Sequence, residues 1–350
     1  MNETMRKRVF SGIQPTGDVH IGNYLGAIRN WVAAQAEKEN IFCVVDLHAL
    51  TIPRDPEALR HQTRSLTALL FAAGLDPEQS ILFVQSHVRA HTESTWLLTC
   101  LTPLGWLQRM TQFKDKSARQ ESVLAGLLNY PVLMAMDILL YDAHEVPVGD
   151  DQKQHVELTR DLAQRFNSLY EQEFFTIPQP VIPPVGARVM GLDDPTSKMS
   201  KSNAHVRGHA VRLLDDPMEI ERSFQRAGTD SFNERAFSDG PDRAGVNNLL
   251  GIYQSITGKG REQVRADFAD ARGYGDLKRR VAEVVIEELR PLRERYDRLM
   301  ADPAELDRLL ARGAEQAAAI AEPKVREMKE LMGLALPPVA EAMAESVGTP

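Results

Sequence analysis

Two lysines lie three residues apart in the segment DPTSKMSKSNA, and lysines placed in this way could stabilise the negative charge of a phosphate group. Lys198 and Lys201 are separated only by Met199 and Ser200, in a segment that has no apolar period. The whole chain carries a net charge of −8, so this pair of cations stands against an acidic background. The segment is either a solvated surface loop or an anion-binding loop.

A second candidate for anion binding is the segment SGIQPTGDVHIGN, residues 11–23. It joins a predicted strand to the start of a predicted helix, where backbone N–H groups and the helix dipole favour a phosphate. Gly22 has no Cβ, so a flat purine ring could approach the backbone there. The G-x-G-x-x-G fingerprint is absent, and Asp18 follows Gly17 where a Walker-type loop has a lysine. An ordinary strand-to-helix turn remains the alternative, with His20 as a packing residue.

A single charge interrupts the apolar segment YPVLMAMDILLY, which covers residues 130–141. Pro131 fits the first turn of a helix, and helical spacing puts Met134 and Asp137 on one face. A buried carboxylate requires a partner, because an unpaired charge in an apolar environment is costly. That partner is either a salt bridge or cap within the protein, or a hydrogen-bond donor on a ligand.

The elements that would position these residues begin as alternating strands and helices. Short apolar runs at residues 9–13, 41–45 and 81–84 are each followed by a segment of helical period. Odd and even positions of these runs are both apolar, so each strand is predicted to be buried on both faces. This predicts a parallel sheet in a doubly wound domain. Ligands of such domains bind beyond the carboxyl ends of the strands. Polar residues follow the three runs at these ends: Gln14, Asp46, His48, Gln85 and Ser86.

From about residue 103 the alternation gives way to helices, apart from a strand-to-helix turn near Gly149. Beyond Ser202 the pattern is helical, over residues 217–226, 247–257, 261–271, 277–300 and 303–332. The predicted fold class is therefore α/β: a doubly wound, Rossmann-like parallel sheet over residues 1–203, followed by a mostly α-helical domain over residues 204–340. Residues 341–350 are predicted to be a flexible tail.

Composition excludes several classes of protein. A chain of 350 residues, 43% hydrophobic and 26% charged, can bury a core and is long enough for two domains. Its longest uncharged runs are too short and too polar to span a membrane, and residues 1–12 lack a signal-peptide pattern, so we expect a cytoplasmic protein. The two cysteines, Cys43 and Cys100, are predicted to be reduced core thiols, which excludes a Cys-ligated zinc or iron–sulfur cluster within one chain.

Taken together, H-I-G-N after the first strand and K-M-S-K-S after the predicted sheet domain resemble the paired signature of the class I aminoacyl-tRNA synthetases. Five segments, in this order and spacing, resemble the bacterial tryptophanyl-tRNA synthetases within that class: GIQPTGDVHIGN, RMTQFKDKSA, LNYPVLMAMDILLY, VPVGDDQKQHVELTRDLAQRFN and KMSKS. The resemblance covers about residues 9–334. Asn23 replaces the second histidine of the class signature, and Met136 stands where a small alanine is usual in the pocket wall.

The resemblance implies an enzyme that activates L-tryptophan with ATP, releases pyrophosphate and transfers the tryptophanyl group to the terminal adenosine of tRNA(Trp). ATP is then a substrate, with Mg²⁺ on its phosphates. The implied ATP-binding residues are Gln14, Pro15, Thr16, Gly22, Asn23, Gly149, Asp150, Asp151, Val189, Lys198, Met199, Ser200, Lys201 and Ser202. The implied catalytic residues are Lys198, Lys201, Ser202, Lys116, Gln14 and Asn23. The implied tryptophan-binding residues are Asp137, which would accept the indole N–H, and Phe10, Val45, Tyr130, Met134 and Gln152.

The resemblance also implies a homodimer, with an interface in an inserted helical segment at about residues 103–141 and one tRNA bridging two subunits. Tyrosyl-tRNA synthetase is the nearest alternative, because that related enzyme also carries an aspartate in its amino-acid pocket. A synthetase-like protein that only binds tRNA is a second alternative, although Gly22, Lys198 and Lys201 are intact. Basic residues on the C-terminal helices are diluted by acids, so no anticodon-reading residue is predicted.

Overall fold

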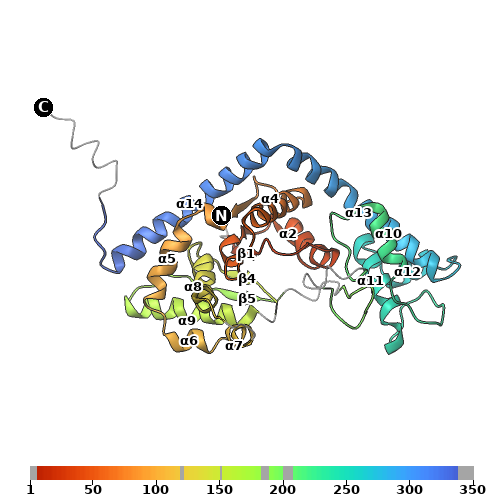
Figure 1. The fold of residues 1–350 in the computed structure, drawn as a ribbon, viewed down its shortest axis with the longest axis horizontal. Coiled ribbons are helices and arrows are strands. Elements are labelled where there is room, and N and C mark those ends of the chain that lie inside the picture. Colours follow the sequence, from red (N-terminus) through yellow and green to blue (C-terminus); the bar gives the residue numbers. More distant parts are fainter. Residues whose placement is uncertain (1–5, 119–121, 150–151, 183–188, 200–207, 338–350) are drawn as a thin grey trace, which may run out of the picture.

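The computed structural model describes residues 6–118, 122–149, 152–182, 189–199 and 208–337. Its centre is a five-stranded parallel sheet with the strand order β3-β2-β1-β4-β5 (Figure 1). The strands are β1 Arg8–Ile13, β2 Glu39–Val44, β3 Ser80–Val84, β4 Glu145–Pro147 and β5 Gln179–Val181. The predicted doubly wound α/β fold is confirmed, and the three N-terminal strands lie within two residues of their predicted bounds.

The order of the strands fixes where a ligand can bind. The chain places β2 and β3 on one side of β1 and then places β4 and β5 on the other side. The strand order therefore reverses between β1 and β4, and ligands of doubly wound sheets bind at such a switch point. The sequence pattern does not predict β5, because three residues with Pro180 in the middle carry too little periodicity.

Alternating side chains of the strands pack into two separate cores. Phe42 and Val44 face one core and Ile41 and Cys43 face the other, so both faces of the sheet are buried, as the uninterrupted apolar runs predict. Helices and helical turns connect the strands and cover the two faces; their bounds are α1 Ile21–Asn23, η1 Tyr24–Ile28, α2 Arg29–Ala34, α3 Asp46–Ala49, α4 Pro56–Ala73, η2 Gln85–His87, α5 Ala90–Thr99, α6 Leu104–Gln108, α7 Thr111–Ser117, α8 Ala125–Leu139 and α9 Lys153–Leu169.

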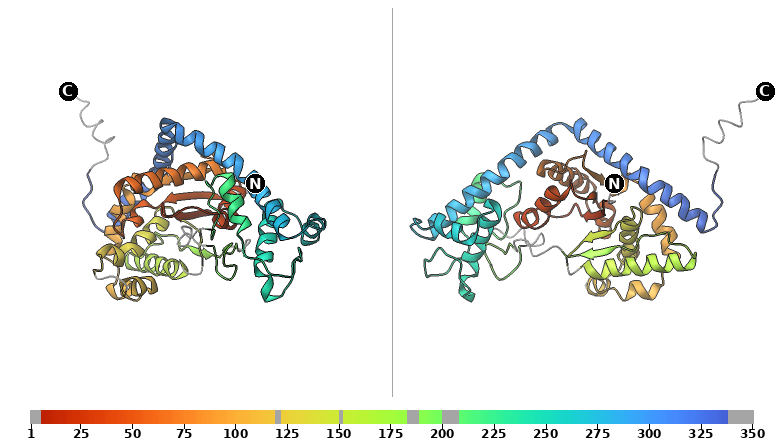
Figure 2. Two further views of the ribbon diagram at one scale, coloured as in Figure 1. Left: turned by 45° about the vertical axis from the view of Figure 1, so that its right-hand side comes forward. Right: turned by 180° about the vertical axis from the view of Figure 1, so that it is seen from behind.

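The C-terminal part is helical, as predicted, and its last helix returns to the sheet. Its elements are α10 Pro217–Gln225, η5 Pro241–Arg243, α11 Ala244–Thr257, α12 Arg261–Asp267, α13 Tyr274–Ala301 and α14 Pro303–Leu331. Asp302 ends α13 and caps α14, where its side chain accepts from the Glu305 N–H at 3.1 Å. The two long helices form an arch over the sheet domain, and α14 packs against β3 and α5 (Figures 1 and 2).

The prediction that both cysteines are core thiols is half wrong. Cys43 is buried in β2, whereas Cys100 is exposed. Cys100 lies at the C-terminal end of α5, where the chain leaves the helix and turns into solvent. In the part of the chain that the structure describes, no helix combines the length and apolarity needed to cross a membrane.

The contact of α14 with β3 depends on one glycine. A Cβ on Gly313 would lie 1.9 Å from the Leu82 carbonyl oxygen, so the helix backbone can pack this closely only without a side chain. Gly313→Ala is expected to lower the free energy of unfolding by about 1–3 kcal/mol through overpacking, measured by urea denaturation. Gly251→Ala is the matched control, because a Cβ on Gly251, in α11, would meet nothing within 4 Å. Equal urea midpoints for the two variants would contradict this account of the contact.

Candidate active site

A cavity of about 500 Å³ lies beyond the carboxyl ends of β1 and β4, at the switch point of the sheet. All the residues expected to bind tryptophan line it: Phe10, Val45, Tyr130, Met134, Asp137 and Gln152. Three further residues expected to bind ATP or to act in catalysis line it as well: Gln14, Lys116 and Gly149. Sequence segments separated by more than a hundred residues therefore meet around one space.

The deep end of the cavity is a buried carboxylate held by three side chains. The Asp137 side chain is almost completely buried in α8. Its Oδ2 lies 2.7 Å from Nε2 of His48, and its Oδ1 lies 2.6 Å from Nδ1 of His91 and 2.7 Å from Nε2 of Gln85. Burial alone would raise the pKa of this carboxyl, but the hydrogen bonds from the two histidines outweigh it and hold the pKa at about 2. Asp137 is therefore ionised at neutral pH.

The walls of the cavity are apolar and aromatic. Phe10 stacks on Tyr141, with ring centroids 5.7 Å apart, which fixes the plane of the Phe10 ring. The Tyr130 hydroxyl is 2.8 Å from Nε2 of His155, and burial raises the pKa of Tyr130 to about 12, so this hydroxyl stays protonated. Lys116 approaches the Tyr130 ring, with Nζ 5.7 Å from its centroid. The cavity thus offers a flat apolar slot with a cation near one wall.

Met136 does not contribute to this wall, contrary to expectation. Met134, Asp137 and Ile138 line the cavity, whereas Met136 does not line it and is fully buried in the core. Helical spacing explains the difference, because a residue one position before Asp137 points about 100° away from it. The side chain at this position is therefore part of the core and not of the cavity wall.

The first signature segment meets the chain that precedes the lysine loop. A Cβ on Gly22, in α1, would lie 3.4 Å from Cβ of Val189, so the start of this helix faces the chain just before the lysine loop. The Asn23 side chain accepts from the His20 N–H at 3.2 Å and so closes the first turn of α1. Thr16 is half-buried, with its hydroxyl 3.5 Å from Oε1 of Gln14.

The first half of the lysine loop is anchored. Lys198 and Met190 form an isolated antiparallel bridge, and the Met199 N–H donates to the Val189 carbonyl at 3.2 Å. Asn248, on α11, clamps Met190 from both sides: its Oδ1 accepts from the Met190 N–H at 2.9 Å, and its Nδ2 donates to the Met190 carbonyl at 3.0 Å. Lys198 is exposed at the end of this turn, whereas Met199 is buried. Five of the expected site residues lie outside the described residues: Asp150, Asp151, Ser200, Lys201 and Ser202.

Comparisons with known proteins agree with this geometry. The family model described as "tRNA synthetases class I (W and Y)" matches residues 2–290. The chain belongs to this family. A protein of Thermosynechococcus vestitus named "Tryptophan--tRNA ligase" is 54% identical over 333 residues, which is 94% of this chain and 100% of that protein. A protein of Wolinella succinogenes with the same name is 52% identical over 331 residues, covering 94% of this chain and 99% of that protein.

Solved structures of the family have the same fold. The tryptophanyl-tRNA synthetase of Campylobacter jejuni, complexed with ADP and tryptophan, superposes with a TM-score of 0.83 at 35% identity, over 93% of this chain and 100% of that one. The tyrosyl-tRNA synthetase of Archaeoglobus fulgidus, complexed with L-tyrosine, superposes with a TM-score of 0.63 at 22% identity, over 84% and 91% of the two chains, and shows the fold alone. The predicted membership of class I is confirmed.

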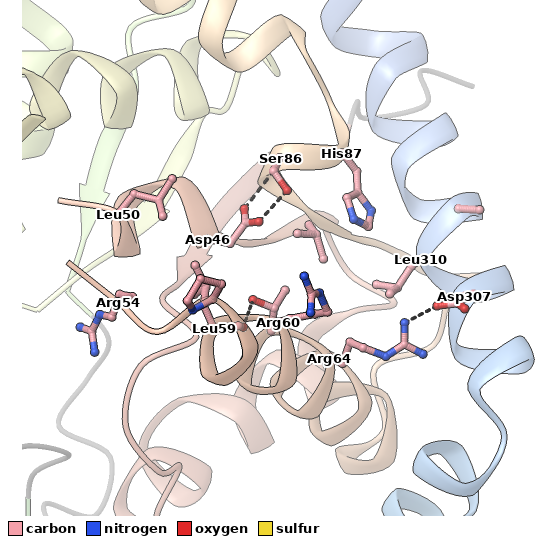
Figure 3. Close-up of a pocket in the computed structure, with 14 residues that line it drawn as sticks. Asp46, Leu50, Arg54, Leu59, Arg60, Arg64, Ser86, His87, Asp307 and Leu310 are labelled. Carbon is pink, nitrogen blue, oxygen red and sulfur yellow. Dashed lines mark hydrogen bonds and ion pairs between the residues drawn. The ribbon is translucent and has the colours of Figure 1, made fainter. Parts of the chain in front are cut away.

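A larger cavity of about 620 Å³ lies on the other side of α3 and does not contain the family's signature residues. In Figure 3 the side chains of Arg60, Arg64 and His87 point into it from α4 and η2. The charges that face it are partly paired: Arg64 bonds to Asp307 of α14, and Asp46 accepts from Ser86. The short helix α3 therefore separates the two cavities, and only its His48 face belongs to the candidate active site.

Several residues of the site are missed by sequence reasoning. His48 and Gln85 are recognisable only as polar residues at strand ends, and nothing in the sequence assigns them to Asp137. His91 lies in the first turn of α5, where a packing residue is the ordinary interpretation. Asn248 belongs to the helical C-terminal part, and its role depends on the return of that part to the lysine loop.

Gly22→Val is expected to raise the KM for ATP by roughly ten- to hundredfold, because a side chain there misplaces the groups around it. A Cβ at this position would lie only 3.0 Å from Nδ1 of His20. The KM is measured by pyrophosphate exchange at varied ATP concentration. Gly26→Val is the matched control, since a Cβ on Gly26 would meet nothing within 4 Å. If Gly22→Val instead melts far below Gly26→Val, this glycine serves helix packing.

Proposed function

We propose that this chain is a tryptophan–tRNA ligase. It joins L-tryptophan to ATP as tryptophanyl-adenylate with release of pyrophosphate, and then transfers tryptophan to the 3′-terminal adenosine of tRNA(Trp). The observation that carries the proposal is the cavity at the switch point, in which an apolar slot ends at the buried acceptor Asp137. Curated relatives that are more than half identical to this chain bear that activity in their names.

The slot suits an indole ring. Phe10, Val45 and Met134 supply apolar contacts. The hydrogen bond between the Tyr130 hydroxyl and His155 fixes the Tyr130 ring. Indole carries one N–H donor, and an ionised carboxylate can only accept, so Asp137 is a matched partner. Gln152 and Gln14 line the cavity nearer to the lysine-bearing side and would hold the polar end of the amino acid.

The activation step needs positioning and charge stabilisation more than a protein nucleophile. The carboxylate of tryptophan attacks the α-phosphorus of ATP, the bond from that phosphorus to the α,β-bridging oxygen breaks, and pyrophosphate leaves with the bonding electrons. Lys116 and Lys198 would offset the charge that develops on the phosphates. Adenine would approach the backbone at Gly22, with Val189 offering backbone hydrogen bonds, and the ribose would lie near Gly149. Mg²⁺ would arrive on the triphosphate and neutralise part of its charge; no His, Cys, Asp or Glu cluster suited to a metal ion occurs among the described residues.

A second copy of the chain and a tRNA are the proposed partners. Large apolar side chains are exposed close to α8: Trp96 on α5, Leu104 on α6 and Leu124 at the start of α8. Apolar surface of this kind favours a dimer interface in the segment predicted from the family resemblance. The concentration dependence of sedimentation is the direct measurement; a monomer at all concentrations would exclude the dimer.

The basic residues of the C-terminal helices do not form a free cationic stripe. Arg279, Arg280 and Arg290 each pair with two acidic side chains. Arg293 and Arg295 donate to backbone carbonyls of Asp215 and Ala72. The interpretation of this stretch as an ordinary solvated helix face is therefore favoured, and the anticodon-binding residues are to be sought elsewhere on the C-terminal part.

The test of the proposed function is amino-acid-dependent exchange of pyrophosphate into ATP, with tryptophan and tyrosine compared. Exchange with tryptophan alone, followed by charging of tRNA(Trp), is the expected result. Exchange with tyrosine alone would replace the proposal by the tyrosyl alternative. Absence of exchange with either amino acid would favour a protein that only binds tRNA.

A further inference from the structure

The Asp137 carboxylate has one acceptor position left for a ligand. A carboxylate has room for about four hydrogen bonds, and three are occupied by His48, Gln85 and His91. Among the described residues, Oδ1 takes two of them, whereas Oδ2 takes only the bond from His48. His48 lines the cavity, but Gln85 and His91 do not. The free position is therefore on Oδ2, on the side that a ligand can reach.

The proton on His91 is fixed by its two neighbours. An ionised carboxylate can only accept, so Nδ1 of His91 carries a hydrogen and donates it to Asp137. Nε2 of His91 lies 2.8 Å from the Tyr141 hydroxyl. Burial, together with the nearby Cys43 and Asp137, raises the pKa of Tyr141, so this hydroxyl keeps its proton. In the described part of the chain its hydrogen has no acceptor other than Nε2, so Tyr141 donates to His91.

We propose that His91, backed by Tyr141, is a positioning residue that keeps Asp137 an ionised, acceptor-only carboxylate and aims its free Oδ2 position at the indole N–H. His91 is completely buried and does not line the cavity, so it acts through Asp137 and not on the substrate. The proposal rests on the proposed function, because it specifies how that function selects tryptophan.

The surroundings explain why such a residue is needed. The groups that face Asp137 come from four elements: Cys43 on β2, His48 on α3, Gln85 on η2 and His91 on α5. Asp46 is the second carboxylate nearby; its charge helps to raise the pKa of the Cys43 thiol, and it accepts a hydrogen bond from Ser86. A buried carboxyl without enough donors takes up a proton, and a protonated carboxyl can present a hydrogen to the incoming N–H. Losing the His91 donor therefore weakens selection for the indole nitrogen.

The experiment compares tryptophan with benzothienylalanine, which has sulfur in place of the indole nitrogen, as substrates for pyrophosphate exchange. The readout is the ratio of the two kcat/KM values, because a purely structural loss lowers both by the same factor. His91→Leu is expected to lower this ratio by roughly ten- to hundredfold. His91→Asn, whose side-chain amide can replace the Nδ1 donor, is expected to stay within about threefold of wild type. His87→Leu, the same change on η2 outside the network, should leave the ratio unaltered.

Tyr141→Phe keeps the inference testable if His91→Leu does not fold. It removes one hydroxyl while the ring can still stack on Phe10, and it is expected to lower the ratio by roughly three- to tenfold. In a His91→Asn background the same change should have no further effect on the ratio, because Tyr141 acts through the histidine.

Two results would overturn the inference. They are an unchanged ratio in both Tyr141→Phe and His91→Leu, or a Tyr141→Phe effect that persists in the His91→Asn background. Pyrophosphate exchange by the wild-type enzyme separates this failure from failure of the proposed function. If the wild-type enzyme shows tryptophan-dependent exchange and the variants leave the ratio unaltered, only the role of His91 is refuted. If the wild-type enzyme shows no tryptophan-dependent exchange, both the proposed function and the role of His91 are refuted.

Discussion

Replacing Lys198 by alanine is expected to slow formation of tryptophanyl-adenylate by roughly a hundredfold while leaving the affinity for tryptophan nearly unchanged. Lys198 is exposed at the end of an anchored turn, bridged to Met190, and it does not line the tryptophan cavity. Its charge is therefore available to the leaving pyrophosphate. A group that interacts more strongly with the transition state than with the substrates changes the rate constant more than the binding constant.

Single-turnover kinetics with separately measured tryptophan affinity tests this expectation. The matched control is Lys259→Ala, which removes a half-buried lysine that pairs with Asp267 in the helical C-terminal part. Lys201 lies outside the described residues, and the family resemblance predicts the same behaviour for Lys201→Ala. Equal losses in rate and in tryptophan affinity would show that the lysine loop supports the pocket instead of the leaving group.

Much of the fold could be predicted because its elements carry local patterns. The buried face of residues 21–34 and the five C-terminal helices follow from apolar periodicity, and their bounds differ little from the observed ones. The short strand β5 and the return of α14 could not be predicted. A strand of three residues has no period, and the contact of Gly313 with Leu82 joins positions more than two hundred residues apart. Such contacts depend on global topology, which a local pattern does not contain.

The candidate site divides in the same way. Lining residues such as Tyr130, Asp137 and Gln152 could be named from the family resemblance, since they belong to motifs with a recognisable spacing. The residues behind Asp137 could not, because His48, Gln85 and His91 come from three elements and are joined only by the folded packing of α3, η2 and α5 on α8. A buried polar network is visible only when all of its members are in place. The sequence shows that Asp137 needs a partner but does not show which one.

The structure makes the test of Asp137 itself more demanding. Asp137→Ala would leave His48, Gln85 and His91 as buried donors without their acceptor, so it is expected to lower stability as well as activity. In the wild-type protein the pKa of Asp137 is depressed. Its carboxylate therefore contributes stability that is present at neutral pH and is lost as the pH falls through about 4 towards about 2. Thermal melting of the variant must therefore be measured beside its kinetics, and Asp137→Asn, which preserves shape, is the companion variant.

For recognition, Asp137→Ala is expected to lower kcat/KM for tryptophan by roughly ten- to hundredfold, because the indole N–H would lose its acceptor in a dry slot. Benzothienylalanine should be a poor substrate for the wild-type enzyme and should lose little more with the variant, since it has no N–H to lose. The two substrates and two proteins form a double-mutant cycle, whose coupling energy measures the contact between the carboxylate and the nitrogen. Destabilisation acts on both substrates alike and cancels from the cycle. Equal losses for the two substrates would therefore mean that Asp137 is a structural anchor for its two histidines, and that selection of tryptophan rests on the shape of the slot.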